Sequence, residues 1–239
     1  MFWGEWEPEG RVVKTIIKPL PGHPEFIVVP LYSSPAEYRG LQNTDPFVFG
    51  DRFLYTGCQQ WTHSRFNRLV PTQLRFLRRG SMILFGSQYK KQFHIDTVFI
   101  VSHWVDHHRA TYETALRGAV PDVYFPVTLL PWYRSGAEVT DEQSFRLYFG
   151  ATYAEPVEGM FSFFPCLPYS PESMGFERPV IKLDGVVTDT LSQGKRITLC
   201  HDIAVVKAYW ARVIDQVILH GLALGLHAEI PKEHSNKYV

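Results

Sequence analysis

The chain has 239 residues, of which 45% are hydrophobic and 20% are charged, and its formal net charge is zero. This length and apolar content are enough to bury a full core, and the absence of a linker or repeat predicts one domain over residues 1–239. No stretch approaches 18 uninterrupted apolar residues, which excludes a membrane-spanning helix, and the early carboxylates of the N-terminus exclude a signal peptide.

The first third of the chain is typical of short strands separated by turns. Apolar or alternating runs predict strands at residues 2–7, 12–18 and 26–32. A polar loop and a strand follow over residues 41–60. Pro71 at a first helical turn predicts a short helix over residues 71–79, which Gly80 ends.

The middle of the chain continues this mixed pattern. Two apolar runs, at residues 80–87 and 96–102, flank the basic turn Gln88–Gln92 and predict a hairpin or a crossover. A short helix is predicted over residues 110–117, closed by Gly118. Further strands are predicted at residues 123–130, 145–149 and 161–164.

Residues 203–224 carry the clearest helical pattern, with Asp202 as N-cap. Apolar residues recur at helical spacing, at Ile203, Val206, Trp210, Val213 and Val217. Many short strands with unevenly placed helices indicate an α+β fold. We therefore expect a mixed or antiparallel twisted sheet, partly barrel-like, with this long C-terminal helix packed on it.

Positive charge is concentrated in one segment. From Arg52 to Ile95 the chain has no Asp or Glu. The basic side chains of this acid-free segment include Arg52, Arg65, Arg68, Arg75, Arg78, Arg79, Lys90 and Lys91. Such a segment predicts a surface that binds nucleic-acid phosphates, and the alternative is a solvated face paired with acids elsewhere.

The densest polar cluster predicts a pocket for a base. Asn43 and Asp45 precede Pro46, which favours an extended backbone at Asp45, so the two side chains can point the same way. Substrate-binding side chains are predicted at Asn43, Tyr55, Gln59, Gln60 and Trp3, with aromatic residues, 15% of the chain, supplying flat walls. The alternatives are an Asp45 turn bonded to the backbone and an aromatic core.

Three carboxylates are candidate catalytic groups. Asp45 could stabilise charge at a sugar anomeric carbon or activate water. Asp96 ends the acid-free segment beside His94, where an acid/base pair or a structural ion pair with the basic turn would fit. Glu5 shares a predicted strand face with Glu7 and Trp3, which predicts either a site or a solvent-facing edge.

The sequence predicts no cofactor and no metal. Cys58, Cys166 and Cys200 are widely separated, which indicates a reducing, cytoplasmic environment. His103 and His107 have a spacing that would suit metal ligands on a helix, but no close cysteine pair supports them, and a polar loop is favoured. Motifs of NTPases, Rossmann dehydrogenases and common serine hydrolases are absent.

Three stretches together resemble a known family. They are NTDPFVFG (43–50) running into YTGCQQ (55–60), LRRGSMILFGS (77–87) running on to DTVFIV (96–101), and GMFSFFPC (159–166). Over roughly residues 1–185 they resemble the nucleotide-modification-associated domains of bacterial phage-defence and DNA-modification systems. The resemblance implies handling of modified bases in DNA, by antiviral glycosylases or by modules that only read such bases.

Three functions are consistent with these patterns. The first is a DNA N-glycosylase that flips a modified base into an aromatic pocket and hydrolyses its glycosidic bond, without the segments typical of uracil glycosylases. The second is a non-catalytic reader of modified nucleic acid that uses the same pocket. The third is a hydrolase or transferase of free nucleotides, with the basic residues on a single phosphate. DNA is the expected partner, with no membrane and no required protein partner.

Overall fold

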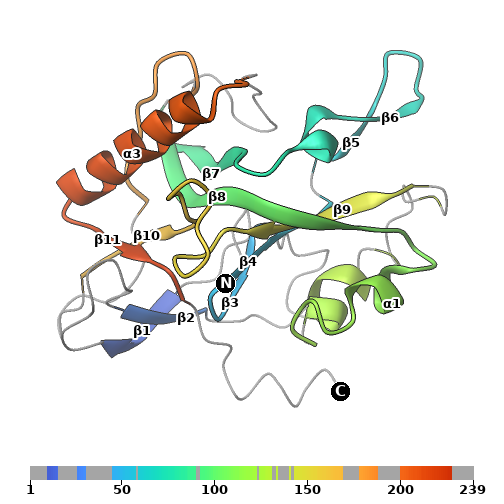
Figure 1. Ribbon diagram of the computed structural model, residues 1–239, viewed down its shortest axis with the longest axis horizontal. Helices are drawn as coiled ribbons and strands as arrows, with labels where there is room; N and C mark the ends of the chain where they lie inside the picture. Colours follow the sequence, from blue (N-terminus) through green and yellow to red (C-terminus); the bar gives the residue numbers. More distant parts are fainter. Residues whose placement is uncertain are drawn as a thin grey trace.

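The computed structural model describes residues 10–15, 26–30, 45–57, 59–89, 92–122, 124–130, 133, 140, 143–168, 178–187 and 200–227. Its centre is a five-stranded sheet with the order β3-β4-β9-β8-β7 (Figure 1). These strands are β3 (Phe47–Phe49), β4 (Arg52–Tyr55), β7 (Met82–Tyr89), β8 (Gln92–His107) and β9 (Phe145–Gly150). Every pairing between them is antiparallel.

Three strand pairs surround this sheet, and each of them is antiparallel. They are β1 (Gly10–Thr15) with β2 (Phe26–Pro30), β5 (Trp61–His63) with β6 (Leu69–Pro71), and β10 (Phe164–Cys166) with β11 (Ala223–Gly225). The predicted α+β class with an antiparallel sheet is therefore confirmed. The described strands form no closed barrel, so the barrel-like character is not seen.

Strand β8 is sixteen residues long and connects the two halves of the sheet. Its first part pairs with β7, and its second part pairs with β9. The predicted hairpin between the two apolar runs is confirmed as β7–β8. The register shifts where Thr97 faces Phe85 and Ile95 faces Gly86, so Asp96 is the extra, bulged residue.

Four helices accompany the strands in the described ranges: η1 (Gln73–Phe76), α1 (Tyr112–Leu116), η2 (Phe125–Leu129) and α3 (Ile203–Leu219). Helix α3 is the predicted C-terminal helix. The Asp202 carboxylate accepts a hydrogen bond from the Ala204 N–H at 2.8 Å, which confirms the N-cap. The helix ends at Leu219 and not at residue 224, because Gly221 has a positive φ and residues 223–225 form β11. No helix in the described ranges is long and apolar enough to cross a membrane.

Other predicted elements differ from the structure. The predicted strand at 123–130 is a π-helix over Phe125–Leu129, because Pro126 suits the first helical positions and Tyr124 and Leu129 both point into the core. The predicted helix at 71–79 is shorter, since Pro71 ends β6 and only Gln73–Phe76 are helical. The strand expected at 161–164 runs over Phe164–Cys166, and the one expected at 12–18 runs over Gly10–Thr15. The predicted strand at 2–7 lies outside the described residues.

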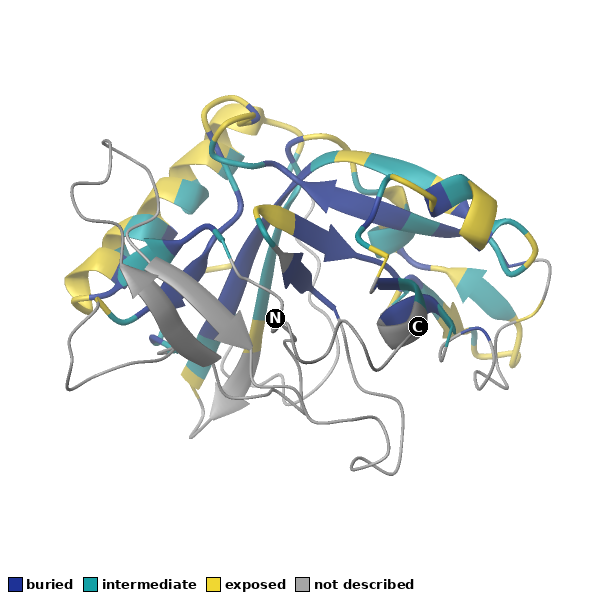
Figure 2. Ribbon diagram, turned by 90° about the horizontal axis from the view of Figure 1, so that it is seen from below, coloured by how far each residue is buried: buried dark blue, intermediate teal, exposed yellow. Residues whose placement is uncertain are grey.

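The core has one cluster on each face of the central sheet and a third under α3. Alternation along β9 sends Phe145, Leu147 and Phe149 to the face that α1 covers, and sends Tyr148 to the other. Helix α3 buries Val213 and Val217 in the same core cluster as Ile95, Val98 and Ile100 of β8, which agrees with its predicted packing on the sheet. Figure 2 shows the central strands buried and the outer side of α3 exposed.

Candidate functional site

The β5–β6 hairpin stands out from the sheet in Figure 1. Its tip is fixed by hydrogen bonds to one residue, Ser64. The Ser64 hydroxyl oxygen accepts from the N–H groups of Phe66 and Arg68 at 3.3 and 3.2 Å, and its carbonyl accepts from Asn67 at 2.9 Å. Asn67 has a φ of 56°, which asparagine tolerates in tight turns. The tip is therefore ordered by its own backbone.

Most arginines of the acid-free segment are exposed. Arg65 and Arg68 lie at the hairpin tip, and Arg78 and Arg79 follow η1. None of these four side chains forms an ion pair with a described carboxylate. Arg52 is also exposed and donates a hydrogen bond to the Ala119 carbonyl at 2.8 Å.

Arg75 is the exception, because its charge is neutralised locally. Its Nη1 lies 3.1 Å from the Asp106 carboxylate, and its other nitrogens donate to Ser144. Arg75 therefore fits the alternative of a basic residue paired with an acid elsewhere. Lys90 and Lys91 lie outside the described residues.

Asp45 begins a chain of buried polar groups on the face that α1 covers. Its carboxylate accepts a hydrogen bond from the Thr56 N–H at 2.8 Å. The Thr56 hydroxyl lies 2.9 Å from His107 Nε2, and the Tyr133 hydroxyl lies 2.7 Å from His107 Nδ1. Together these contacts form a polar chain of Asp45, Thr56, His107 and Tyr133, in which every side chain is buried.

Burial determines the protonation of this polar chain. Burial, together with the smaller effect of the positive charges of Arg75 and His108, lowers the pKa of His107 to about 3. His107 is therefore a neutral imidazole at pH 7, with one ring nitrogen as donor and the other as acceptor. Burial also raises the pKa of Tyr133, so that its hydroxyl keeps its proton.

Tyr124 adds a second buried hydroxyl close to Asp45. Burial raises its pKa, and the charge of Asp45 raises it further. Among the described residues its buried oxygen has no hydrogen-bond partner, and an unsatisfied buried hydroxyl normally costs about 1–3 kcal/mol. Tyr124 immediately precedes η2, and π-helical turns are frequent at functional sites.

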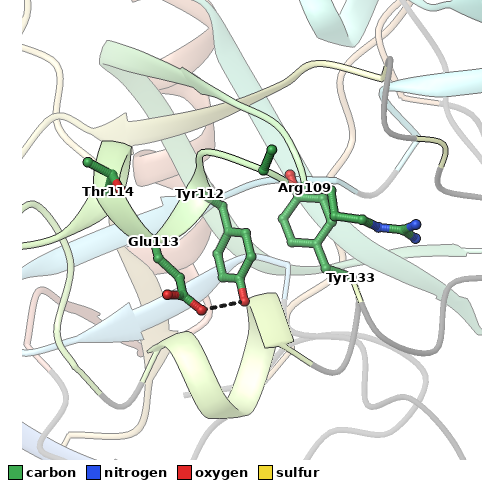
Figure 3. Close-up of a pocket in the computed structure, with 6 residues that line it drawn as sticks. Arg109, Tyr112, Glu113, Thr114 and Tyr133 are labelled. Carbon is green, nitrogen blue, oxygen red and sulfur yellow. Dashed lines mark hydrogen bonds between the residues drawn. The ribbon is translucent and has the colours of Figure 1, made fainter.

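The polar chain ends in the wall of a hollow of about 400 Å³ (Figure 3). Tyr112 and Tyr133 stack there, with ring centroids 4.7 Å apart, and their hydroxyls point to opposite ends in the figure. The Tyr112 hydroxyl donates to the Glu113 carboxylate at 3.0 Å, while that of Tyr133 contacts His107. We call this hollow the tyrosine pocket; the described residues that line it are Arg109, Ala110, Tyr112, Glu113, Thr114 and Tyr133.

The hairpin and the tyrosine pocket lie at the same end of the sheet. Trp61, at the base of the hairpin, donates to the Ser144 carbonyl at 3.1 Å and packs edge-on against Phe145. Phe145 in turn contacts the ring of Tyr133, with centroids 6.3 Å apart. Phe145 also pairs with His107 at the point where β9 begins and β8 ends.

Asp96 lies in a different part of the molecule. It is buried at the bulge of β8, with a carboxylate oxygen 2.8 Å from Arg178 Nε. Burial raises the pKa of Asp96 to about 8, and the guanidinium of Arg178 acts in the opposite direction. At about 3.3 Å per residue, the eleven-residue step from Asp96 to His107 spans about 36 Å along β8. Asp45 and Asp96 therefore do not share one site.

Two predicted substrate-binding residues have structural roles instead. Tyr55 is buried and stacks on Tyr148 in the core on the opposite face from the polar chain. Gln60 is also fully buried, and its amide bonds both the carbonyl and the N–H of Arg146, at 2.7 and 2.9 Å, as a neighbouring strand would. Their burial leaves neither side chain a surface for a ligand.

The other predicted residues do not converge on the pocket. Gln59 is exposed in the turn before the hairpin, where its carbonyl accepts from the Thr72 hydroxyl at 2.6 Å. Glu5, Trp3 and Asn43 lie outside the described residues, so their roles stay predictions.

The histidines weighed as metal ligands lie on a strand, and neither on a helix nor in the polar loop that was favoured for them. His103 and His107 are on β8, where four residues span about 13 Å, too far for one ion. The described ranges hold no group of three or more His, Cys, Asp or Glu side chains that could bind a metal.

Apart from Asp45, the residues of the polar chain were not recognisable from spacing. Thr56 follows the predicted Tyr55, and His107 belonged to the histidine group considered for a metal, but nothing in the sequence paired them. Tyr112 and Tyr133 had no signal beyond the high aromatic content.

Comparison with known proteins finds no match among protein-family models, curated proteins or solved structures. The resemblance to nucleotide-modification-associated domains stays a prediction.

The structural role of Gln60 can be tested by removing its amide. Gln60→Leu keeps the volume but leaves the N–H and carbonyl of Arg146 without partners, so the free energy of unfolding should fall by about 2–4 kcal/mol. Urea denaturation measures this, and Gln73→Leu at an exposed position is the matched control. Equal stability of the two variants would contradict the structural role.

The buried neutral His107 predicts a pH dependence of stability. Its folded pKa, about 3, lies below the ordinary value of 6.5, so between these values only the unfolded chain binds the proton. Stability conferred at this position should therefore fall as pH falls from 6.5 towards 3, by up to about 1.4 kcal/mol per pH unit.

Asp96 has the opposite effect on stability between its ordinary pKa of 3.8 and its folded pKa of about 8, because there only the folded chain binds the proton. Wild type is therefore compared at each pH with His107→Gln, in which the contribution of Asp96 is the same. The difference in unfolding free energy, wild type minus His107→Gln, should become smaller as pH is lowered from 7 to 5. His63→Gln, at an exposed histidine, should leave the wild-type pH dependence unchanged. Parallel stability curves for wild type and His107→Gln would contradict a neutral buried His107.

Proposed function

We propose that this protein binds nucleic acid, with exposed arginines of the acid-free segment on the phosphates and an unstacked base at the tyrosine pocket. The observation that carries the proposal is the set of four exposed arginines, Arg65, Arg68, Arg78 and Arg79, none of which pairs with a described carboxylate. Exposed arginines that do not pair with described carboxylates attract a polyanion and bind it in a salt-dependent manner.

The tyrosine pocket supports recognition of a base. Two of the residues that line it, Tyr112 and Tyr133, are aromatic. The pocket lies beside the base of the hairpin, because Trp61 contacts Phe145 and Phe145 contacts Tyr133. A base that leaves its stack could lie against these rings, while the Tyr133 hydroxyl and the Glu113 carboxylate offer hydrogen bonds to its edge. DNA carrying a modified base is the partner that the family resemblance favours.

The proposed setting is the cytoplasm. The two described cysteines, Cys166 and Cys200, are free thiols, and Cys166 is buried. Free thiols are typical of reducing compartments, where DNA is also accessible.

A second candidate function is hydrolysis of the N-glycosidic bond of the bound base. One observation favours it: the Tyr133 hydroxyl in the pocket wall joins a polar chain that leads through neutral His107 and Thr56 to Asp45. The Tyr133 hydroxyl could give its proton to the departing base while water attacks the anomeric carbon, and the proton that this water releases restores the phenol. In this version Asp45 only positions the chain, because its carboxylate bonds the Thr56 backbone N–H and does not line the pocket among the described residues.

Removing charge at the hairpin tip tests nucleic-acid binding. The double variant Arg65→Ala, Arg68→Ala should weaken binding to a single-stranded oligonucleotide and reduce its logarithmic salt slope by about 0.7 for each phosphate that is no longer neutralised. Fluorescence anisotropy at several salt concentrations measures both. The matched control removes two exposed charges from α3, Lys207→Ala and Arg212→Ala. An equal effect of the two double variants would remove the hairpin from the binding surface.

The enzymatic candidate is tested by base release. Wild-type protein incubated with DNA carrying modified bases should produce alkali-labile abasic sites. Tyr133→Phe should lower the rate by about 10²–10⁴-fold, because it removes the hydroxyl that the chain presents to the pocket. Tyr112→Phe removes a hydroxyl from the same wall that does not contact His107, and should retain most of the activity. No abasic sites with wild type would leave binding as the function.

A further inference from the structure

The tip of the β5–β6 hairpin combines one exposed aromatic ring with positive charge. Phe66 is 72% exposed, and the Arg65 guanidinium carbon lies 4.9 Å from the centre of its ring. Arg68 and His63 are exposed on the same hairpin. From Trp61 to Pro71 the hairpin contains no carboxylate.

This arrangement is fixed before any ligand binds. The hydrogen bonds from Phe66 and Arg68 to the Ser64 hydroxyl oxygen hold the tip, and Ser64 N–H closes the loop to the Arg68 carbonyl at 2.7 Å. Because the backbone is already ordered, a ligand would not have to supply that ordering free energy. The exposed position of Phe66 is therefore set by the turn.

A single exposed phenylalanine is common on protein surfaces and alone indicates nothing. What distinguishes Phe66 is its surroundings: a guanidinium close to its ring, a second arginine two residues away and no acid on the hairpin. Aromatic and arginine side chains together on a basic surface are the combination that binds unpaired bases, with the ring on the base and the charges on the backbone.

We propose that Phe66 stacks on an unpaired nucleobase while Arg65 and Arg68 contact the flanking phosphates, so that the hairpin selects single-stranded or locally unpaired nucleic acid. In a continuous duplex both faces of each base are covered by its neighbours, and a side chain reaches them only where the stack is broken. This inference rests on the proposed nucleic-acid binding and specifies the form of nucleic acid that is bound.

An anionic membrane is a different occupant for a basic tip with an apolar residue. One ring gives little apolar area, and stable attachment to a membrane takes more than one weak anchor. The structure offers a single ring at this tip, which favours a base.

The test separates stacking from charge. Binding of wild type and Phe66→Ala is measured by anisotropy with a single strand of about 12 nucleotides. The same measurement is made on its fully abasic counterpart, which keeps the phosphates, and on the matching duplex. Phe66→Ala should weaken binding to the normal single strand by about tenfold and leave binding to the abasic strand and the duplex unchanged. Phe66→Trp should restore the preference for bases.

The matched control is Leu219→Ala, which removes an exposed apolar side chain, 84% accessible, from the end of α3 and should change nothing. An equal loss on normal and abasic strands, or no loss on either, overturns the stacking role while the proposed function stands. No binding of wild type to any of these nucleic acids overturns both. Phe66-dependent binding to vesicles of anionic lipid, without oligonucleotide binding, also overturns both in favour of a membrane surface.

Discussion

The pairing of β8 with two different partners is the constraint on which the rest of the structure depends. One end of this strand pairs with β7 and carries the bulge at Asp96, and the other end pairs with β9 and carries His107. Because side chains alternate along the strand, His107 points to the α1 face while Trp104 points to the face of the opposite core cluster. The strand thus keeps the two buried acids apart and places the polar chain beside the hairpin.

Burial of polar groups explains why the side chain of His107, at the end of β8, has a defined hydrogen-bond partner on each ring nitrogen. Buried polar groups are nearly always hydrogen-bonded, and Thr56 and Tyr133 supply a partner to each ring nitrogen of His107. Thr56 is held in turn through its backbone N–H by Asp45. The chain therefore joins the segment before β3, the segment after β4, strand β8 and the segment containing Tyr133. It places the phenol of Tyr133 in the wall of the pocket in a defined orientation.

Local patterns predicted the elements whose determinants are close in sequence. The apolar periodicity of 203–217 and the cap at Asp202 identified α3, and the two apolar runs identified the β7–β8 hairpin. The strand predicted at residues 123–130 was wrong, because a β-branched and aromatic composition does not distinguish a strand from a buried helical turn. The polar chain could not be predicted, since its contacts join residues 11, 51 and 26 positions apart. The acid-free segment was visible in the sequence, but only the fold separates the paired Arg75 from the exposed arginines.

The turn at Ser64 has a consequence for how this surface can change. Its hydrogen bonds involve backbone groups of residues 66, 67 and 68, and Gln60 anchors the preceding segment through the backbone of Arg146. The side chains at positions 65 and 66 therefore contribute little to holding the loop in place. Evolution, or a library randomised at these two sites, can exchange them at small cost to folding, so the exposed surface of the hairpin can change in shape and charge while the scaffold stays constant.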